Sequence, residues 1–135
     1  MNLAEWLVRT AKRQPDTPAL MLGEDLVATY TQFADHAARI GALLRSRYQI
    51  APGDRVAIFM KNSPAYLEML YGIWFCGAVA VPINAKLHPR EAAYIVEDSG
   101  CRVVFVSGAD ELAPLLPPAY PSKLVLDKVC PIAPV

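Results

Sequence analysis

The sequence has little charge, and neither sign is clustered. Charged residues make up 19% of the 135 residues, and 13 basic side chains balance 13 acidic ones. Neither sign forms a run that could bind a polyanion or an anionic membrane surface. We therefore expect no nucleic-acid partner.

Long hydrophobic runs are also absent. Apolar runs such as Met69–Cys76 and Ala78–Ile83 are far shorter than the roughly 20 residues that a membrane-spanning helix needs. The first helical segment carries four charged residues between positions 5 and 13, which is not the pattern of a cleavable secretory signal. These absences predict a cytoplasmic chain without a membrane span.

Cysteine is scarce, and its spacing is not that of a metal site. Cys76, Cys101 and Cys130 are an odd number, form no CxxC pair and have no neighbouring histidine or cysteine. They are predicted to be reduced and mostly buried thiols. No grouping of Ser, His and Asp indicates nucleophilic catalysis either, so the sequence assigns no catalytic and no metal-binding residue.

Apolar residues, in contrast, are abundant. They form 54% of the sequence, and the length corresponds to one domain of roughly 100 to 200 residues. Either the fold buries most of its surface, or part of that surface packs against polypeptide outside these residues. In the second case, exposed apolar surface would favour a homodimer or other self-association.

The N-terminal part predicts a helix, a hairpin and a second helix. The first helix is expected to be capped by Asn2 and to place Trp6 and Leu7 on one apolar stripe. Short apolar runs at 19–22 and 26–31, separated by Gly-Glu-Asp, are typical of a β-hairpin. The next helix repeats apolar residues at helical spacing, namely Phe33, Ala37, Ile40 and Leu44.

Strands and helices then alternate. They are predicted, beginning with a strand, at 55–60, 65–76, 78–83, 89–99 and 102–106. Pro82 indicates an edge strand or a strand end, because proline cannot donate to the ladder. Alternation of this kind implies parallel strands with right-handed crossovers. The predicted fold class is therefore α/β, with a mainly parallel, doubly wound sheet, flanking helices and an antiparallel hairpin near the N-terminus.

The compact unit is predicted to end at residue 107. Residues 1–107 should form an α/β subdomain, and residues 108–135 a proline-rich tail that leads to further polypeptide. Within the tail, 110–116 is predicted to be a short helix and 123–127 a last strand.

Several short segments of the sequence occur together in one enzyme family. They are Ala28–Phe33 (ATYTQF), Pro52–Ala57 (PGDRVA), Lys61–Ser63 (KNS) and Gly77–Asn84 (GAVAVPIN), and the segment from His88 to Val106 fits the same template. In this order they resemble the N-terminal region of the AMP-forming acyl-CoA synthetases, a family that also holds luciferases and peptide-synthetase adenylation domains. The resemblance covers about residues 3–107 and implies the N-terminal part of the large domain of such an enzyme.

The resemblance also implies an activity for the complete parent protein. Family members activate a carboxylic acid, here a fatty or aromatic one, with ATP and Mg²⁺ to an acyl-adenylate, and pass the acyl group to coenzyme A. It further implies that the Ser/Thr/Gly-rich phosphate loop, the metal-binding glutamate and the C-terminal lysine lie beyond residue 135, so the isolated chain is expected to be inactive. The rival hypothesis is a free-standing α/β module that binds or scaffolds a partner without catalysis.

Lys86 is the candidate cofactor-binding residue. It follows Asn84 and Ala85, where some acyl- and aryl-CoA ligases carry a basic residue that contacts the phosphates of coenzyme A. The resemblance therefore implies this role for Lys86, and the alternative is an ordinary solvated lysine near a helix start. Arg90 can likewise be read as a phosphate contact or as a solvated side chain, and the support for a phosphate contact is weaker than for Lys86.

The remaining candidates are predicted to have structural roles. His36 lies on the polar side of its helix and His88 precedes a proline at a helix start, so surface or capping roles are favoured over acid-base catalysis. Five residues of the helix at 65–76 are predicted to pack in the core rather than to line an acyl tunnel: Tyr66, Met69, Leu70, Ile73 and Trp74.

Overall fold

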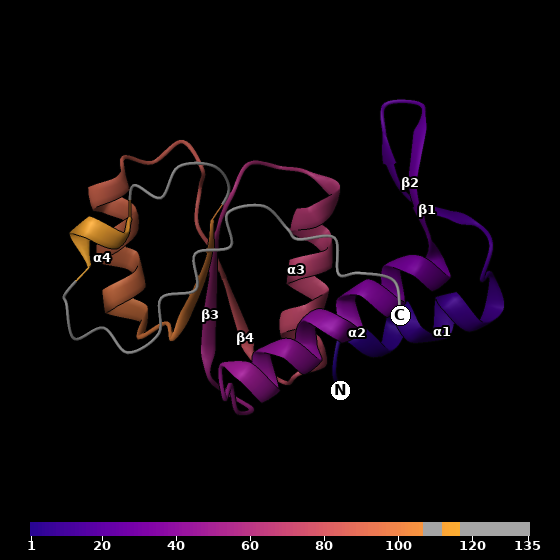
Figure 1. Cartoon of the computed structure of the whole chain (residues 1–135), viewed down its shortest axis with the longest axis horizontal. Coiled ribbons are helices and arrows are strands. Elements are labelled where there is room, and N and C mark those ends of the chain that lie inside the picture. The colour runs from indigo at the N-terminus through magenta and orange to yellow at the C-terminus, as the bar shows by residue number, and fades with distance from the viewer. Residues whose placement is uncertain (107–111, 117–135) are drawn as a thin grey trace.

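The computed structural model describes residues 1–106 and 112–116, which form an α/β unit (Figure 1). In chain order the elements are α1 (Ala4–Arg13), β1 (Pro18–Leu22), β2 (Asp25–Thr29), α2 (Tyr30–Arg47), β3 (Arg55–Phe59), α3 (Pro64–Phe75), β4 (Val79–Pro82), α4 (Pro89–Ser99), β5 (Val103–Val106) and the 3-10 turn η1 (Ala113–Leu115). Helices and parallel strands alternate from β3 to β5, as predicted.

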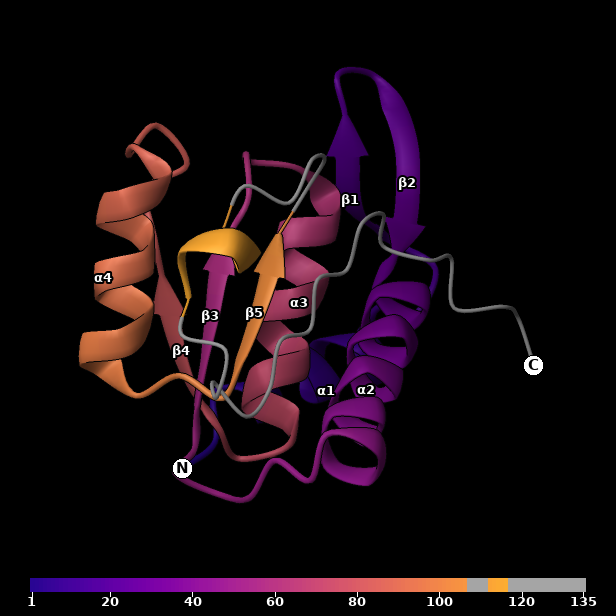
Figure 2. The same cartoon turned by 60° about the vertical axis from the view of Figure 1, so that its left-hand side comes forward.

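β3 is the central strand of a three-stranded parallel sheet with the order β4-β3-β5. Its Ile58 is in register with Pro82 of β4 and with Phe105 of β5. The chain passes from β3 to β4 through α3, and then back across β3 to β5 through α4. Right-handed crossovers that run in opposite directions place their helices on opposite faces, and Figures 1 and 2 show α3 and α4 on opposite sides of the sheet. The predicted mainly parallel sheet with flanking helices is confirmed.

The sheet separates two hydrophobic clusters. Val56 and Ile58 of β3 pack on the side of α2 and α3, whereas Ala57 packs with Val104 on the side of α4. This alternation is the two-residue period of a strand. A strand that is covered on both faces must be apolar throughout, which explains the apolar run from residue 56 to residue 59.

α3 lies between the sheet and α2, and its apolar residues mostly form core. Met69 and Ile73 are buried in the cluster on the sheet, and Leu70 packs against that cluster. The core interpretation is therefore confirmed for these three residues. Trp74 is only partly buried and contacts Tyr71 edge to face, with ring centroids 5.0 Å apart.

Two glycines allow α2 and α3 to pack closely. A Cβ atom on Gly72 would lie 2.5 Å from the Cγ2 atom of Ile40, and one on Gly41 would lie 2.9 Å from the carbonyl oxygen of Gly72. Both distances are shorter than the roughly 3.5 to 4.0 Å of ordinary contact between carbon atoms. The seam between the two helices therefore has room for glycine only at these positions.

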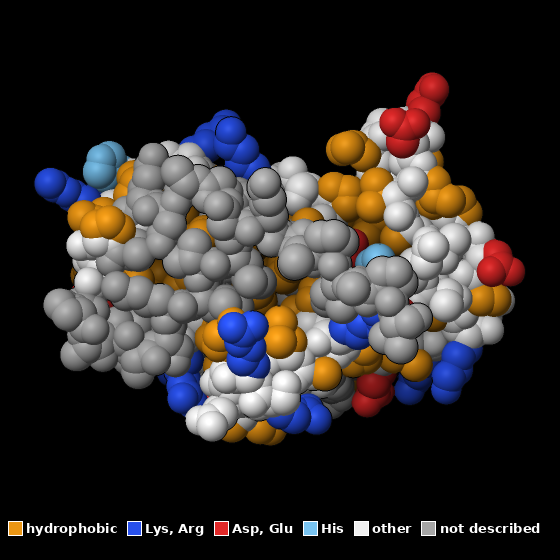
Figure 3. All heavy atoms as spheres, viewed as in Figure 1, with side chains coloured by type: hydrophobic (Ala, Val, Ile, Leu, Met, Phe, Trp, Pro, Cys, Tyr) orange, Lys and Arg blue, Asp and Glu red, His pale blue; other side chains and the backbone are white. Residues whose placement is uncertain are grey.

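The predicted hairpin is present and projects from the body of the fold (Figure 1). Leu20 of β1 and Ala28 of β2 are buried in a cluster with Phe33 of α2. The apolar residues near the tip of the hairpin are exposed; these are Met21, Leu22, Leu26 and Val27. Figure 3 shows these apolar side chains gathered below the acidic tip. The second strand ends at Thr29, two residues before the predicted end, because Thr29 and Gln32 form a capping box that starts α2.

α1 departs from its predicted pattern. Ala4 and Leu7 are buried, but Trp6 is 55% exposed, because only the side of α1 that meets α2 and α3 is covered. Trp6 and Leu7, which were expected on one apolar stripe, therefore differ in burial. Leu3 rather than Asn2 occupies the cap position, although the Asn2 Oδ1 atom accepts a hydrogen bond of 2.9 Å from the N–H of Ala4.

The C-terminal predictions are only partly within the described residues. The helix expected at 110–116 is a 3-10 turn, η1, where described, and Leu112 and Leu116 pack into the cluster beside α4. The strand expected at 123–127, and Cys130, lie outside the described residues. Cys76 and Cys101 are buried thiols, as predicted, and burial raises the pKa of both.

Candidate functional site: a pocket at the carboxyl ends of β3 and β4

The loops that follow β3 and β4 diverge. The first leads to α3 on one face of the sheet, and the second leads to α4 on the other. In doubly wound sheets, loops that separate in this way leave a ligand-binding crevice outside the carboxyl ends of the strands. A pocket of about 420 Å³ lies at this position. It is lined by Met60, Lys61, Asn62, Tyr66, Pro82, Ile83, Asn84, Ala85 and Lys86.

The loop after β4 presents Lys86 on an ordered turn. The Ile83 N–H donates a hydrogen bond of 2.9 Å to the carbonyl oxygen of Ile58, which ties the loop to β3. The Asn84 Oδ1 atom accepts a hydrogen bond of 2.9 Å from the Lys86 N–H, and the Asn84 carbonyl accepts one of 3.0 Å from the Leu87 N–H. These bonds fix the backbone of Lys86, while its side chain is exposed.

The loop after β3 is held at both ends. Met60 is buried in the core, and the Ser63 hydroxyl caps α3 by accepting a hydrogen bond of 3.3 Å from the Tyr66 N–H. Lys61 lies between these two anchors and is exposed. Tyr66 borders the pocket from the first turn of α3, and burial raises the pKa of its hydroxyl group. Tyr66 therefore stays protonated at neutral pH and can donate or accept a hydrogen bond.

The charge of the pocket favours an anion. Lys61 and Lys86 both line it, and none of the lining residues that the structure describes is acidic. Phosphate groups are a natural ligand for such a lining, because lysine is a common point-charge partner of phosphate. The lining fits the phosphates of a nucleotide or of coenzyme A.

The described residues do not fit a protein-held Mg²⁺ ion. Mg²⁺ is usually bound through one or two carboxylates together with substrate phosphates, and the described part of the pocket lining contains no carboxylate. Across residues 1–106 and 112–116, no group of three His, Cys, Asp or Glu side chains is placed to hold a metal ion. The same residues include no helix that is long and apolar enough to cross a membrane.

His88 and Arg90 lie outside this pocket. The His88 Nδ1 atom accepts a hydrogen bond of 3.1 Å from the Arg90 N–H, and the Glu91 carboxylate accepts one of 3.2 Å from the His88 N–H. His88 is thus the N-cap of α4, which confirms the predicted capping role. Arg90 borders a separate shallow hollow on α4 with Tyr94.

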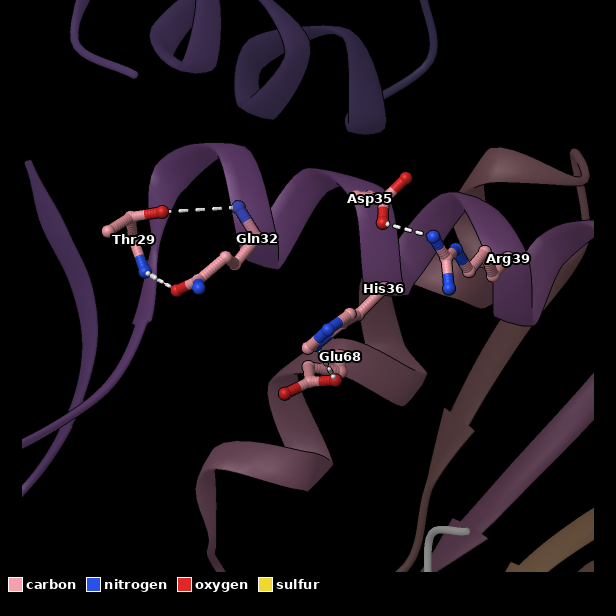
Figure 4. A network of polar contacts seen from close by, with 6 residues as sticks. All are labelled: Thr29, Gln32, Asp35, His36, Arg39 and Glu68. Carbon is pink, nitrogen blue, oxygen red and sulfur yellow. Dashed lines mark hydrogen bonds and ion pairs between the residues drawn. The ribbon is translucent and has the colours of Figure 1, made fainter. Parts of the chain in front are cut away.

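His36 has a partner that sequence analysis missed. Its Nδ1 atom lies 3.1 Å from the Oε2 atom of Glu68, which reaches across from α3 (Figure 4). Glu68 is buried, and burial raises the pKa of its carboxyl group, while the contact with His36 opposes that rise. The pair lies at the seam of α2 and α3, and neither residue lines the pocket at β3 and β4.

Lys61 is the second residue that sequence analysis did not assign. It stands 25 positions before Lys86 in the chain, yet both border one pocket, because β3 and β4 are adjacent and parallel. Parallel strands were predicted, and parallel neighbours end at the same edge of the sheet. The sequence alone could not show which side chains would converge there.

A parallel sheet whose loops diverge over a pocket is the arrangement in which proteins of the doubly wound α/β class bind their ligands. Comparison with known families makes the assignment specific. The profile of the family described as AMP-binding enzyme matches residues 7–132. The chain belongs to this family.

Individual relatives agree with this assignment. The fatty acid–[acyl-carrier-protein] ligase ScoC from Streptomyces coeruleorubidus is 38% identical over 118 residues, which cover 85% of this chain and 22% of the relative. A feruloyl-CoA synthase from an Amycolatopsis species is 38% identical over 103 residues, which cover 76% of this chain and 21% of that protein. The chain therefore spans about a fifth of the length of these curated relatives.

Solved structures show the same fold. The N-terminal domain of FACL13 from Mycobacterium tuberculosis superimposes with a TM-score of 0.79 and is 33% identical. The match covers 93% of this chain and 33% of that chain. The described fold is thus that of the N-terminal domain of a protein in this family.

Proposed function

We propose that the chain is the N-terminal portion of an AMP-forming acyl-CoA synthetase. The complete enzyme would activate a fatty or aromatic carboxylic acid with ATP and Mg²⁺ to an acyl-adenylate and transfer the acyl group to coenzyme A. The observation that carries this proposal is the family match over residues 7–132. The names of the relatives, which include a fatty-acid ligase and a feruloyl-CoA synthase, support the two acid classes.

Within that enzyme, Lys86 would contact the phosphates of coenzyme A. Its place in a pocket with a cationic lining supports this role. The hydrogen bond from the Lys86 N–H to Asn84 would hold the backbone of Lys86 in place, so that only side-chain freedom is lost on binding. The alternative, a lysine that is merely solvated, predicts that Lys86 can be replaced without effect on coenzyme A.

In the complete enzyme, this chain would serve as a scaffold and the catalytic residues would lie on other segments. Residues 1–107 would form the folding unit, and residues 108–135 would lead to the polypeptide that carries the phosphate loop and the Mg²⁺ ligand. The cationic pocket would bind and orient a phosphate group, without making or breaking a bond. The isolated 135-residue chain would then catalyse no adenylation, and the complete enzyme would act in the cytoplasm.

The test is to express the complete coding sequence that contains this chain. Carboxylate-dependent exchange of pyrophosphate into ATP, and thioester formation that requires coenzyme A, are expected with fatty or aromatic acids. The 135-residue chain is the matched control and should show no exchange above a blank. Absence of both activities in the complete product would contradict the proposal. A coding sequence that stops at Val135 would favour the rival, a free-standing binding module.

A further inference from the structure

We infer that Lys61 is a second phosphate-binding residue, which acts together with Lys86 on one phosphorylated ligand. This inference rests on the proposed function, because it takes the pocket at β3 and β4 to be a ligand site. It adds a contact from the loop after β3, where no relative's name and no motif assigns one.

The first support is convergence from two independent loops. Lys61 stands two residues after the end of β3, and Lys86 stands four residues after the end of β4. Both border the same pocket of about 420 Å³, which is the size of a small-molecule site. A phosphate in this pocket would meet a cation on each side.

The second support is the absence of competing groups. Among the described residues, no carboxylate lines the pocket and neither lysine forms an ion pair. Both side chains are exposed, so the energy lost in desolvating either ammonium group is small. The two charges therefore remain available to an incoming anion.

The third support is the order of both loops. Lys61 lies between buried Met60 and Ser63, the N-cap of α3, and Lys86 lies on the turn that Asn84 holds. Because each backbone is fixed, only side-chain freedom is lost when a ligand binds. Tyr66, in the first turn of α3, also lines the pocket, and its hydroxyl group can offer one neutral hydrogen bond to the same ligand.

The test measures binding to the ¹⁵N-labelled 135-residue chain by NMR titration. Four probes separate the sources of phosphate: coenzyme A, dephospho-coenzyme A without the 3′-phosphate, ATP, and pantetheine without any phosphate. The variants are Lys61→Met, Lys86→Met and Lys61→Arg, and Lys12→Met on α1 is the control for loss of one exposed charge. Amide shifts at Lys61 and Lys86 report the site, and the remaining shifts report that each variant is folded.

Coenzyme A is expected to bind more tightly than pantetheine. Each methionine variant in the pocket should bind it about fivefold more weakly, which is the scale of one exposed charge contact. Lys61→Arg should restore most of the affinity, and Lys12→Met should change nothing. Affinity should also fall as the ionic strength rises from about 0.01 M to about 0.15 M, because exposed charges are screened.

The other outcomes separate the inference from the proposed function. If Lys86→Met weakens binding and Lys61→Met does not, the inference about Lys61 is overturned and the proposed role of Lys86 stands. If ATP binds more tightly than coenzyme A with the same dependence on both lysines, the two-lysine site stands and the coenzyme A assignment of Lys86 fails. Equal binding of coenzyme A and pantetheine would overturn both.

Discussion

The Nδ1 atom of His36 lies 3.1 Å from the Oε2 atom of Glu68, and this contact joins α2 to α3 across their seam (Figure 4). Glu68 is the only acidic residue of α3 and is buried there, whereas the side chain of His36 is 37% exposed. Burial raises the pKa of Glu68 above its ordinary value of 4.5, and His36 lowers it in part. The helix seam therefore contains a group whose charge state depends on pH.

Glu68 should make the stability of the fold fall as pH rises. Because its pKa is raised in the folded state, the folded protein holds this proton more tightly than the unfolded chain does. The contribution of Glu68 to the free energy of unfolding is therefore complete below pH 4.5 and is lost as pH rises through the raised pKa. Urea unfolding can compare the wild type with Glu68→Gln across this range. The free energy of unfolding of the wild type should fall relative to that of Glu68→Gln as pH rises, so that any advantage of the wild type shrinks or reverses. His36→Gln should extend this loss of stability to higher pH, because His36 lowers the pKa of Glu68. If the stability of the wild type relative to Glu68→Gln instead grew with pH, the raised pKa of Glu68 would be contradicted.

Gly72→Ala should destabilise the fold. Alanine is favoured over glycine in a helix by about 1 kcal/mol, but its Cβ atom would lie 2.5 Å from the Cγ2 atom of Ile40. Overpacking of this kind typically costs about 1 to 3 kcal/mol, so a net loss is expected in chemical denaturation. Leu67→Ala on the exposed side of α3 is the control and should have a smaller effect. A gain in stability for Gly72→Ala would contradict this, because it would show that α2 and α3 can move apart to admit the Cβ atom without a cost in packing energy.

Asp54 should have the opposite pH dependence to Glu68. Its Oδ2 atom accepts a hydrogen bond of 2.8 Å from the Ala51 N–H, which is the main cause of its lowered pKa, and Arg102 at 3.0 Å adds to it. Stability from this group is present above the ordinary value of 3.8 and is lost as pH falls through the lowered pKa. Asp54→Asn should thus be less stable than the wild type near neutral pH, with a difference that narrows in acid. Arg102→Gln should lower the stability less than Asp54→Asn does, because Arg102 is a lesser cause of the lowered pKa. A stability difference between the wild type and Asp54→Asn that widens in acid would contradict a lowered pKa of Asp54.

The apolar hairpin tip should promote self-association of the 135-residue chain. Leu22 is 63% exposed and Leu26 is 53% exposed, on a hairpin that projects from the body (Figure 3). The double variant Leu22→Ser, Leu26→Ser should sediment with less dependence on concentration than the wild type, with little change in stability, because both side chains are exposed. A wild-type chain that remains a monomer at high concentration would remove this prediction.

Sequence periodicity predicted the elements well where local signals agreed. Ser63-Pro64 starts α3, Gly100 in the left-handed region ends α4, and the apolar runs at β3 and β5 are buried on both faces. These signals are local and depend on backbone geometry or on burial. They therefore predicted the order of the elements along the chain and a parallel sheet with flanking helices without knowledge of any tertiary contact.

Contacts between distant elements could not be predicted in the same way. Glu68 appeared as an isolated charge on an apolar helix, and its partner is 32 residues away on α2. Trp6 follows the helical stripe of Leu7, but only part of that stripe meets another helix. Lys61 becomes a candidate ligand-binding residue only because the loop after β4, which carries Lys86, borders the same pocket. Each case depends on which surfaces pack together, which periodicity does not specify.

The pocket at the carboxyl ends of β3 and β4 is proposed to serve the coenzyme A step of an adenylate-forming enzyme. The most direct measurement compares wild type and Lys86→Ala in the product of the complete coding sequence. The apparent KM for coenzyme A should rise about fivefold, the scale of one exposed charge contact, while carboxylate-dependent pyrophosphate exchange stays unchanged. An unchanged KM, or a loss of exchange with no change in KM, would contradict the claim.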